Sequence, residues 1–597
     1  MLDVHEQSIT IPGISYVVDT GRQKCRNYNA GTGVASYDIM WISKAAADQR
    51  AGRAGRTGPG HCYRLYSSSM YGRHMDAFAL PEVMTRPLED VVLAMKAMKI
   101  TNVAEFPFPT PPGTDQLSAA VKLLANLGCI DTSRMEEDGG DGLITRLGAA
   151  VAKLPLGVRY GKMLLVSAEA GVLDYAIAMV AVLSEASPFV VHGQSLDTQD
   201  DKEKDDSDDD DSDEEMNIQQ EEEKKKVKKN RWVHRGGDVL AGMLAVGAYT
   251  YAGRGAGGAS EQMACRKFCE ENGLHPVVMA RIQKMRVHLA RLAQARLSSA
   301  DGVAARTGGI LSSMKPPNKA QEQLLCQAIA SGLLDNVAML APLGSLSGDY
   351  SFSLRSAYMS CCSNLKEPLL MDRNSVVFSR DPRQLPKWIC YDSIIRKTTK
   401  DGTPVATLKN ITPIDCAWLG TLAKGSRLLT LGEPQPTPIP TYDAEDDVVL
   451  CSVRTKYGNH GWEIPSVQAE MYTVLQSPEA KSSSHFLSDD SFRWFARFLL
   501  EGRVFDEIKD ISWNDNPTLV TRRTPSAKVA LLVSALATAG IDSAAALRKH
   551  WAEKDTKFLY SAIQKWVPPD SAAHVKSVWI SMVKKKVKIW KARGGRN

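Results

Sequence analysis

The sequence predicts a multidomain protein of the α/β plus mainly α class. Its 597 residues correspond to about four domains, each large enough to bury a core of its own. Short apolar runs near the N-terminus are typical of buried strands. From 149 to 300 alanine, leucine and methionine recur at helical spacing, and from about 316 to 440 the pattern changes to short strands and turns. We therefore expect an α/β part, a helical bundle and a small β-barrel in succession.

Composition and charge indicate a globular protein with a nucleic-acid partner. Hydrophobic residues make up 44% of the chain and charged residues 24%. The net charge of +5 combines one long acidic run with an otherwise more basic chain, so nucleic acid is a reasonable partner. Eleven cysteines without framework spacing, and no signal peptide, indicate a reducing compartment. No apolar run approaches the roughly 18 residues of a membrane span, so we expect no membrane function.

The stretch from Gln49 to Arg56 carries the strongest chemical signal. Its three arginines are separated by glycine and alanine, and forked permanent charges on a slim backbone suit phosphate oxygens. The pattern predicts an arginine-finger segment, and an arginine-rich surface helix is the alternative, which the glycines weaken. The segment follows an apolar strand at 14–19 and a hairpin at 24–41, and it precedes a strand at 62–66. Because the first strand comes so early, we expect the chain to begin inside a domain.

Amphipathic helices are predicted beyond residue 85. The first begins after Pro87, and its buried face is expected to hold Leu88, Val91, Val92 and Met95. A second is capped by Thr114 and stopped by Gly128, and a third begins near Gly148. These stripes indicate core packing and no chemistry of their own.

Three further stretches leave alternatives open. Cys265, Cys269, His275 and His288 are spaced unlike a structural zinc finger, and buried thiols are the simpler interpretation. The acidic and then lysine-rich stretch within 195–230 predicts a disordered loop, with a kinase target or a tether to a basic partner as alternatives. The basic stretch 584–593 suits phosphate contact or nuclear import, or is a solvated helix end.

Several motifs occur in the order and spacing of one enzyme family. Thr10 to Ile14, Val17 to Gly21, Trp41 to Ala45 and Gln49 to Arg56 resemble the C-terminal part of the second RecA-like domain of DEAH/RHA-type RNA helicases. Later stretches resemble the small-subunit processome branch of that family, and they are 106–112, 449–453, 461–465 and 495–505.

The resemblance implies five parts. They are the partial RecA-like domain (1–67), a winged-helix domain (68–148), a helical ratchet bundle (149–315) with the disordered insert 195–230, an OB-type β-barrel (316–440) and a branch-specific C-terminal extension (441–597). Gly237 to Leu240 corresponds to a landmark of the ratchet domain. Strands of the barrel are expected at 375–378, 388–395 and 411–414.

The resemblance also implies nucleotide-binding residues. Gln49, Arg53 and Arg56 match motif VI, whose arginines stabilise charge on the γ-phosphate while water attacks it. Ser8 matches the motif V serine that senses the nucleotide. The implied cofactor is ATP with Mg²⁺. The sequence has neither a Gly-x-x-x-x-Gly-Lys-Ser/Thr loop nor Asp-Glu-Ala-His, so we expect a fragment or truncated form that is inactive alone, with the Mg²⁺ ligands on a first RecA-like domain.

Two segments are implied to contact RNA. Lys24 and Arg26 lie on the hairpin that matches the family's strand-separating hairpin. Lys397, Thr399 and Lys400 match an RNA-facing segment of the OB-type domain, with solvated strand-end charges as the alternative.

The resulting hypothesis is a portion of an ATP-dependent RNA helicase that remodels small nucleolar RNA/pre-rRNA duplexes in small ribosomal subunit biogenesis. The expected partners are these RNAs and ribosome-assembly proteins, including an activator, and the expected location is the nucleus and nucleolus. The alternative is a non-catalytic RNA-binding or processome scaffold module left by truncation.

Overall fold

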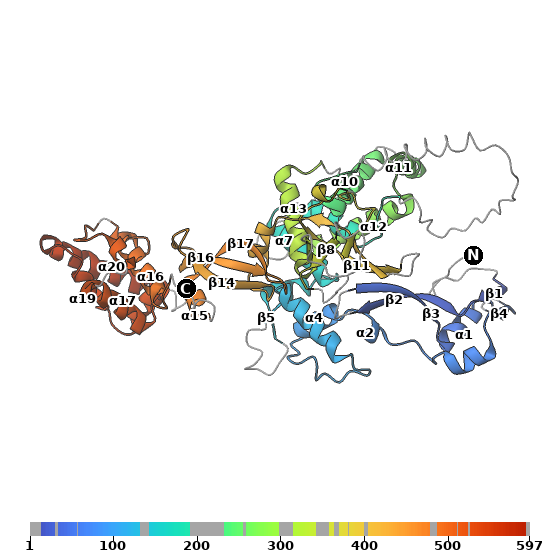
Figure 1. Cartoon of the computed structure of the whole chain (residues 1–597), viewed down its shortest axis with the longest axis horizontal. Coiled ribbons are helices and arrows are strands. Elements are labelled where there is room, and N and C mark those ends of the chain that lie inside the picture. Colours follow the sequence, from blue (N-terminus) through green and yellow to red (C-terminus); the bar gives the residue numbers. More distant parts are fainter. Residues whose placement is uncertain are drawn as a thin grey trace. The chain divides into compact units, whose positions relative to one another are not determined.

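The computed structural model of this chain divides into two compact units, which are described separately. The first unit holds residues 1–418 and 422–428, and the second holds 419–421 and 429–597. The elements are coloured along the sequence in Figure 1. The structure describes residues 14–29, 34–55, 58–131, 142–190, 232–254, 258–297, 315–341, 357–362, 369–379, 381–398, 404–477, 486–509, 511–522 and 526–592. The predicted disordered insert, 195–230, lies outside the described residues.

Two short parallel strands near the start of the first unit support a helix. β1 (Tyr16–Asp19) pairs with β4 (His61–Arg64), which confirms both predicted strands. α1 (Lys44–Ala51) packs on β1, and the hydroxyl of its N-cap Ser43 accepts a hydrogen bond from the Ala46 amide at 3.2 Å. The helix includes the first residues of the arginine segment, so the helical alternative holds for them. Gly52 ends the helix, as its low helix propensity favours.

The predicted hairpin is confirmed, and it joins a larger sheet. β2 (Arg22–Asn29) pairs antiparallel with β3 (Val34–Trp41), and β3 pairs in parallel with β11 (Ser393–Thr398). The result is a nine-stranded sheet in the order β13-β10-β7-β8-β9-β12-β11-β3-β2. Residues from both ends of the first unit therefore share one sheet.

A small group of helices follows the first strands, and the predicted helices are confirmed, although the N-cap of the second is Gly113 and not Thr114. Its elements are η1 (Met70–His74), α2 (Glu82–Thr85), α3 (Glu89–Ala97), α4 (Thr114–Asn126), β5 (Ile130–Asp131), β6 (Leu143–Ile144) and α6 (Arg146–Val151). One face assignment is wrong, since Val91 is 44% exposed. Leu93 and Lys96 are buried instead, so the buried arc of α3 is centred on Val92 and Val91 lies at its edge.

A helical bundle forms the next part of the first unit. It consists of α7 (Val158–Glu169), α8 (Leu173–Leu183), α10 (Gly237–Ala252), α11 (Ala259–Asn272), α12 (Pro276–Leu297) and α13 (Lys319–Gly332). The buried-thiol interpretation is confirmed, because Cys265 and Cys269 of α11 are 7% and 0% exposed. Burial raises the pKa of the Cys269 thiol to about 11. Among the described residues, no group of histidine, cysteine or acidic side chains is arranged to hold a metal ion.

The β-rich part closes the first unit. Besides β11 it contains β7 (Val337–Leu340), β8 (Ala357–Ser360), β9 (Leu369–Met371), β10 (Trp388–Cys390), β12 (Pro404–Lys409) and β13 (Thr412–Pro413), with η3 (Leu334–Asn336) and η5 (Pro382–Gln384). The residues of α14 (Cys416–Leu422) are divided between the two units. The strand predicted at 388–395 is two strands, β10 and β11. The strand predicted at 375–378 is wrong, because these residues form a turn.

The second unit pairs a four-stranded sheet with a helical domain. Its sheet contains β14 (Leu429–Gln435), β15 (Thr441–Asp443), β16 (Val448–Tyr457) and β17 (Trp462–Glu470). Its helices are α15 (Met471–Gln476), α16 (Asp490–Leu500), η7 (Asp506–Ile508), η8 (Pro517–Thr521), α17 (Ala527–Ala539), α18 (Ala544–Glu553), α19 (Tyr560–Gln564), η9 (Pro569–Ser571) and α20 (Ala572–Ala592). Large aromatic side chains fill the core, among them Trp551, Trp566 and Trp579.

In the part of the chain that the structure describes, no single helix is both long and apolar enough to cross a membrane. α17 and α18 reach that length and composition only as a pair, and they meet at a bend of 78°.

Candidate nucleotide and RNA interface

Asp19, at the end of β1, anchors α1 against the strands. Its side chain is fully buried, and its Oδ1 lies 3.0 Å from Nη1 of Arg50. The same oxygen accepts a hydrogen bond from the Gly21 amide at 3.0 Å, and Oδ2 accepts one from the Tyr66 hydroxyl at 2.9 Å. Arg50 also donates to the Arg22 carbonyl at 3.1 Å. A buried carboxylate needs such partners because an unpaired interior charge is costly. Arg50 is therefore a structural arginine.

Gly21 and Tyr66 make this anchor specific. Gly21 has a φ of +70°, and a Cβ at this position would lie 2.6 Å from the Tyr66 ring, so only glycine fits. Burial and then the hydrogen bond to Asp19 raise the pKa of Tyr66, so its hydroxyl remains a donor. Trp41 packs edge-on against Tyr66, and the Arg22 guanidinium lies 3.6 Å above the Trp41 ring. The hairpin is thus tied to the same anchor.

The predicted nucleotide-binding residues lie on and just after α1. Gln49 is exposed near the end of the helix. Arg53 is half-buried in the turn that follows, and its amide donates to the Arg50 carbonyl at 3.1 Å. Ser8 and Arg56 lie outside the described residues. Gln49 and Arg53 therefore belong to one helix end, whose position is fixed by the Asp19 anchor.

The same turn is held by a close backbone approach. A Cβ at Gly60 would lie 2.2 Å from the carbonyl oxygen of Ala54, which is itself buried. A glycine is therefore required where β4 is about to begin. By contrast, a Cβ at Gly55 would meet no atom within 4 Å. Close packing therefore requires a glycine at position 60, after the arginine segment, but not at position 55 within it.

Strand register brings the predicted RNA-binding positions onto neighbouring strands. Lys24 and Arg26 are on β2, and Lys397 is on β11, with β3 between the two strands. Asn27 lies opposite Ser36 of β3, which lies opposite Arg396 of β11. Arg26 comes directly before Asn27 and Lys397 directly after Arg396, so both positions lie next to these paired residues. Adjacent strands are about 4.8 Å apart, so the two backbones are separated by roughly 10 Å. The Lys24 side chain is exposed. Thr399 and Lys400 lie outside the described residues.

Asp238 connects the helical bundle with the β-rich part, a role that sequence reasoning missed. This partly buried carboxylate near the start of α10 accepts hydrogen bonds from the Val376 amide at 2.7 Å, the Ile411 amide at 2.8 Å and the Ser375 hydroxyl at 2.9 Å. Burial raises its pKa, although the three donors oppose that shift. The turn at 375–378 forms because Ser375 and Val376 within it donate hydrogen bonds to Asp238. In the sequence, the only indication of this contact was the resemblance of Gly237 to Leu240 to a landmark of the ratchet domain.

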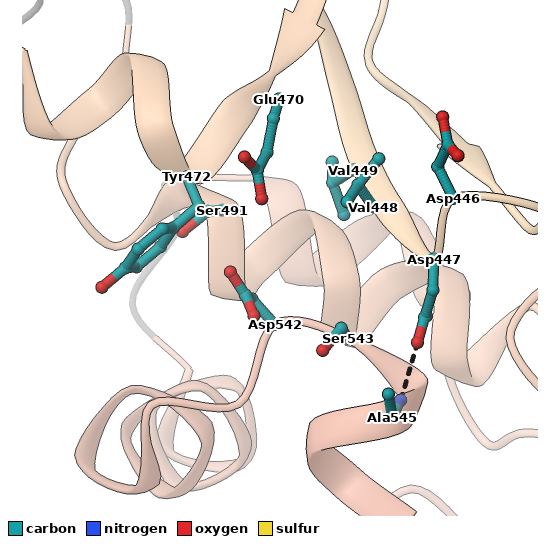
Figure 2. A pocket seen from close by; sticks show the side chains of 10 residues that line it. All are labelled: Asp446, Asp447, Val448, Val449, Glu470, Tyr472, Ser491, Asp542, Ser543 and Ala545. Atoms are coloured by element: carbon teal, nitrogen blue, oxygen red, sulfur yellow. Dashed lines mark hydrogen bonds between the residues drawn. The ribbon is translucent and has the colours of Figure 1, made fainter. Parts of the chain in front are cut away.

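An acidic hollow in the second unit is shown in Figure 2. The cavity measures about 180 Å³, and its walls include Asp446, Glu470 and Asp542. Asp447 accepts hydrogen bonds from the Ala544 and Ala545 amides, each at 2.7 Å, at the N-terminus of α18. Burial, and then nearby carboxylates, raise the pKa of Asp542. Since Asp447 caps a helix, its role here is structural.

Three segments match known domain families. Residues 158–241 match the helicase associated domain (HA2), ratchet-like, and 325–425 match the oligonucleotide/oligosaccharide-binding (OB)-fold. Residues 515–583 match the DEAH helicase DHX37 C-terminal domain.

Similar proteins match along almost the whole chain. It is 31% identical over 592 residues to a Drosophila melanogaster protein named probable ATP-dependent RNA helicase kurz, covering 98% of this chain and 45% of the relative. It is 32% identical over 591 residues to the human probable ATP-dependent RNA helicase DHX37, covering 97% and 46%. A stretch of 188 residues is 50% identical to the Saccharomyces cerevisiae probable ATP-dependent RNA helicase DHR1, covering 32% and 14%. The chain spans about half the length of the first two relatives.

Proposed function

We propose that this chain, a homologue of ATP-dependent RNA helicases of the DHX37 and kurz type, is the RNA-gripping portion of such an enzyme. The family resemblance is confirmed by the matches to the ratchet-like and DHX37 C-terminal domains and to helicases along the chain. Residues 1–67 would be the C-terminal part of the second RecA-like domain, and 68–148 a winged-helix domain. These two domains would together hold the C-terminal end of α1 and the hairpin in position relative to RNA.

The end of α1 is the proposed γ-phosphate contact. Gln49, Arg53 and Arg56 would contact the terminal phosphate of ATP, which is bound with Mg²⁺ by a domain that precedes these residues. Guanidinium groups there would stabilise the negative charge that develops as water attacks phosphorus. Arg50 takes no part, because it is bound to Asp19. The rigid Asp19 anchor supports this role, since an arginine finger must be preorganised.

The observation that carries the RNA-binding proposal is the shared sheet of β2, β3 and β11. Basic positions from the hairpin and from the OB-fold segment approach one another there, although more than 350 residues separate them in the sequence. Such a row would hold a single strand by its phosphates while the hairpin obstructs a duplex. Lys24, Arg26, Lys397 and Lys400 would contact phosphates, and Thr399 would donate to one.

The proposed substrates are duplexes of small nucleolar RNA with pre-rRNA in small ribosomal subunit biogenesis, in the nucleus and nucleolus. This proposal is supported by the match of 515–583 to the DHX37 C-terminal domain. Ribosome-assembly proteins, including an activator, would be the protein partners. A second candidate is a non-catalytic RNA-binding or scaffold module, favoured by the lack of a phosphate loop in these 597 residues.

The salt dependence of RNA binding tests the phosphate contacts. If Lys24, Arg26, Lys397 and Lys400 each contact one phosphate, affinity for oligouridine should fall about fiftyfold between roughly 50 and 200 mM salt. Replacing Lys24 and Arg26 by glutamine should make this dependence shallower. Lys153→Gln, at an exposed lysine near α6, is the matched control and should change nothing. An affinity that is independent of salt would contradict the proposal.

A further inference from the structure

The second unit carries a basic groove along its last helix, α20. The groove has a volume of about 760 Å³, and it lies between α20 and the segment that contains Thr556, Lys557 and Tyr560. The remaining walls come from α20 alone, namely Lys576, Trp579, Ile580, Val583, Lys584, Val587, Lys588 and Lys591. None of the described residues that line it is acidic.

The groove has the length of a short helix. Its α20 wall runs from Lys576 to Lys591, so at 1.5 Å per residue it extends for about 22 Å, or four turns. Ile580 and Val587 lie along this wall, and Ile580 is 43% exposed. An elongated apolar floor of this kind suits the apolar face of a helix better than a compact ligand.

The rim of the groove has one sign of charge. Lys557, Lys576, Lys584, Lys588 and Lys591 are all exposed. Within the described part of the chain, none of them forms an ion pair. The neighbouring lysines of α20 differ, because Lys585 and Lys586 lie 3.3 Å and 3.1 Å from the Glu507 carboxylate. The groove therefore has an uncompensated positive rim, and a complementary occupant would be acidic.

We propose that this groove binds an acidic amphipathic helix of a partner protein, with its apolar side on Ile580 and Val587 and its carboxylates facing the lysine rim. A single strand of RNA fits less well. Bases bind to exposed aromatic faces, whereas Trp579 is only 2% exposed and Tyr560 is partly buried against the core. This surface is independent of the proposed RNA contacts of β2 and β11.

The test measures binding of a fluorescein-labelled peptide to the full chain by fluorescence anisotropy. The peptide is a helix of about 18 residues, with leucine at every third or fourth position and glutamate and alanine elsewhere. Reversing the rim charge with Lys576→Glu, Lys584→Glu and Lys588→Glu should weaken binding about tenfold or more. Ile580→Ala should weaken it several-fold. The control pair Lys549→Glu and Lys565→Glu, at exposed lysines outside the groove, should have little effect.

Two further measurements keep the result unambiguous. Replacing the same three rim lysines by glutamine should weaken binding less than reversal, with an unchanged unfolding transition that excludes misfolding. Oligouridine binding should be unaffected by any groove variant. The proposal is overturned if the peptide does not bind, if charge reversal leaves its affinity unchanged, or if reversal weakens oligouridine as strongly as the peptide. It is also overturned if the groove joins two copies of this chain, seen as a dimer that charge reversal dissociates.

Discussion

Arg50 and Arg53 are three residues apart, and replacing each by alanine should have a different effect. Arg50→Ala should destabilise the structure locally, whereas Arg53→Ala should abolish ATP turnover. Arg50 donates hydrogen bonds to Asp19 at 3.0 Å and to the Arg22 carbonyl at 3.1 Å. Arg50→Ala would leave the buried Asp19 carboxylate with Gly21 and Tyr66 alone. Breaking a fully buried pair costs about 3–5 kcal/mol. The Arg50 side chain is 25% exposed, so solvent screening reduces the expected loss to about 2–3 kcal/mol.

Hydrogen exchange of the amides in α1 and β1 measures this loss locally, which suits a chain with several domains. A loss of 2–3 kcal/mol corresponds to exchange that is faster by roughly thirty- to one-hundred-and-sixtyfold. Arg53→Ala should change exchange much less than Arg50→Ala, because the turn at Arg53 is closed by backbone hydrogen bonds, whereas Arg50 holds the buried Asp19 carboxylate. In an enzyme with an intact ATP site, however, Arg53→Ala should abolish turnover. Unchanged protection in Arg50→Ala, or equal loss in both variants, would refute the division of roles.

Two further predictions concern the charged side chains of Lys162 and Asp238. Burial lowers the pKa of Lys162 to about 8, against 10.5 for an ordinary lysine, so between these pH values the unfolded chain binds the extra proton. The free energy of unfolding should therefore rise with pH in this window, by up to about 3 kcal/mol. Melting temperatures measured across these pH values should no longer rise in Lys162→Met, but they should still rise in the exposed control Lys153→Met. Asp238→Ala orphans the donors at Ser375, Val376 and Ile411, so hydrogen exchange of the amides around this contact should show a local loss of about 3–6 kcal/mol. A loss below about 1 kcal/mol would contradict this contact's role.

The sequence predicted local patterns well and long-range partners poorly. The strands β1 and β4, the hairpin, and the helices after Pro87 and Thr114 follow from apolar periodicity and turn residues, which act within a few positions. The turn at 375–378 could not be predicted, because its donors bind Asp238, which lies 137 residues before Ser375. A run rich in valine looks like a strand unless that acceptor is known.

The candidate site shows the same limit. Spacing identified the arginine segment, but it could not distinguish a structural arginine from a phosphate contact. Asp19, 31 residues before Arg50, makes that distinction through one buried carboxylate. Likewise, the sequence around Lys24 does not indicate that β3, the partner of its strand, also pairs with β11, because strand register is set by tertiary packing.

RNA-stimulated ATP hydrolysis tests the central claim most directly. The chain would be assayed alone and fused behind the N-terminal half of the Drosophila relative, with and without Arg53→Ala. We expect no turnover by the chain alone, RNA-stimulated turnover by the fusion, and its loss in the Arg53→Ala fusion. Turnover by the chain alone, or a fusion that hydrolyses ATP equally well without Arg53, would contradict the account.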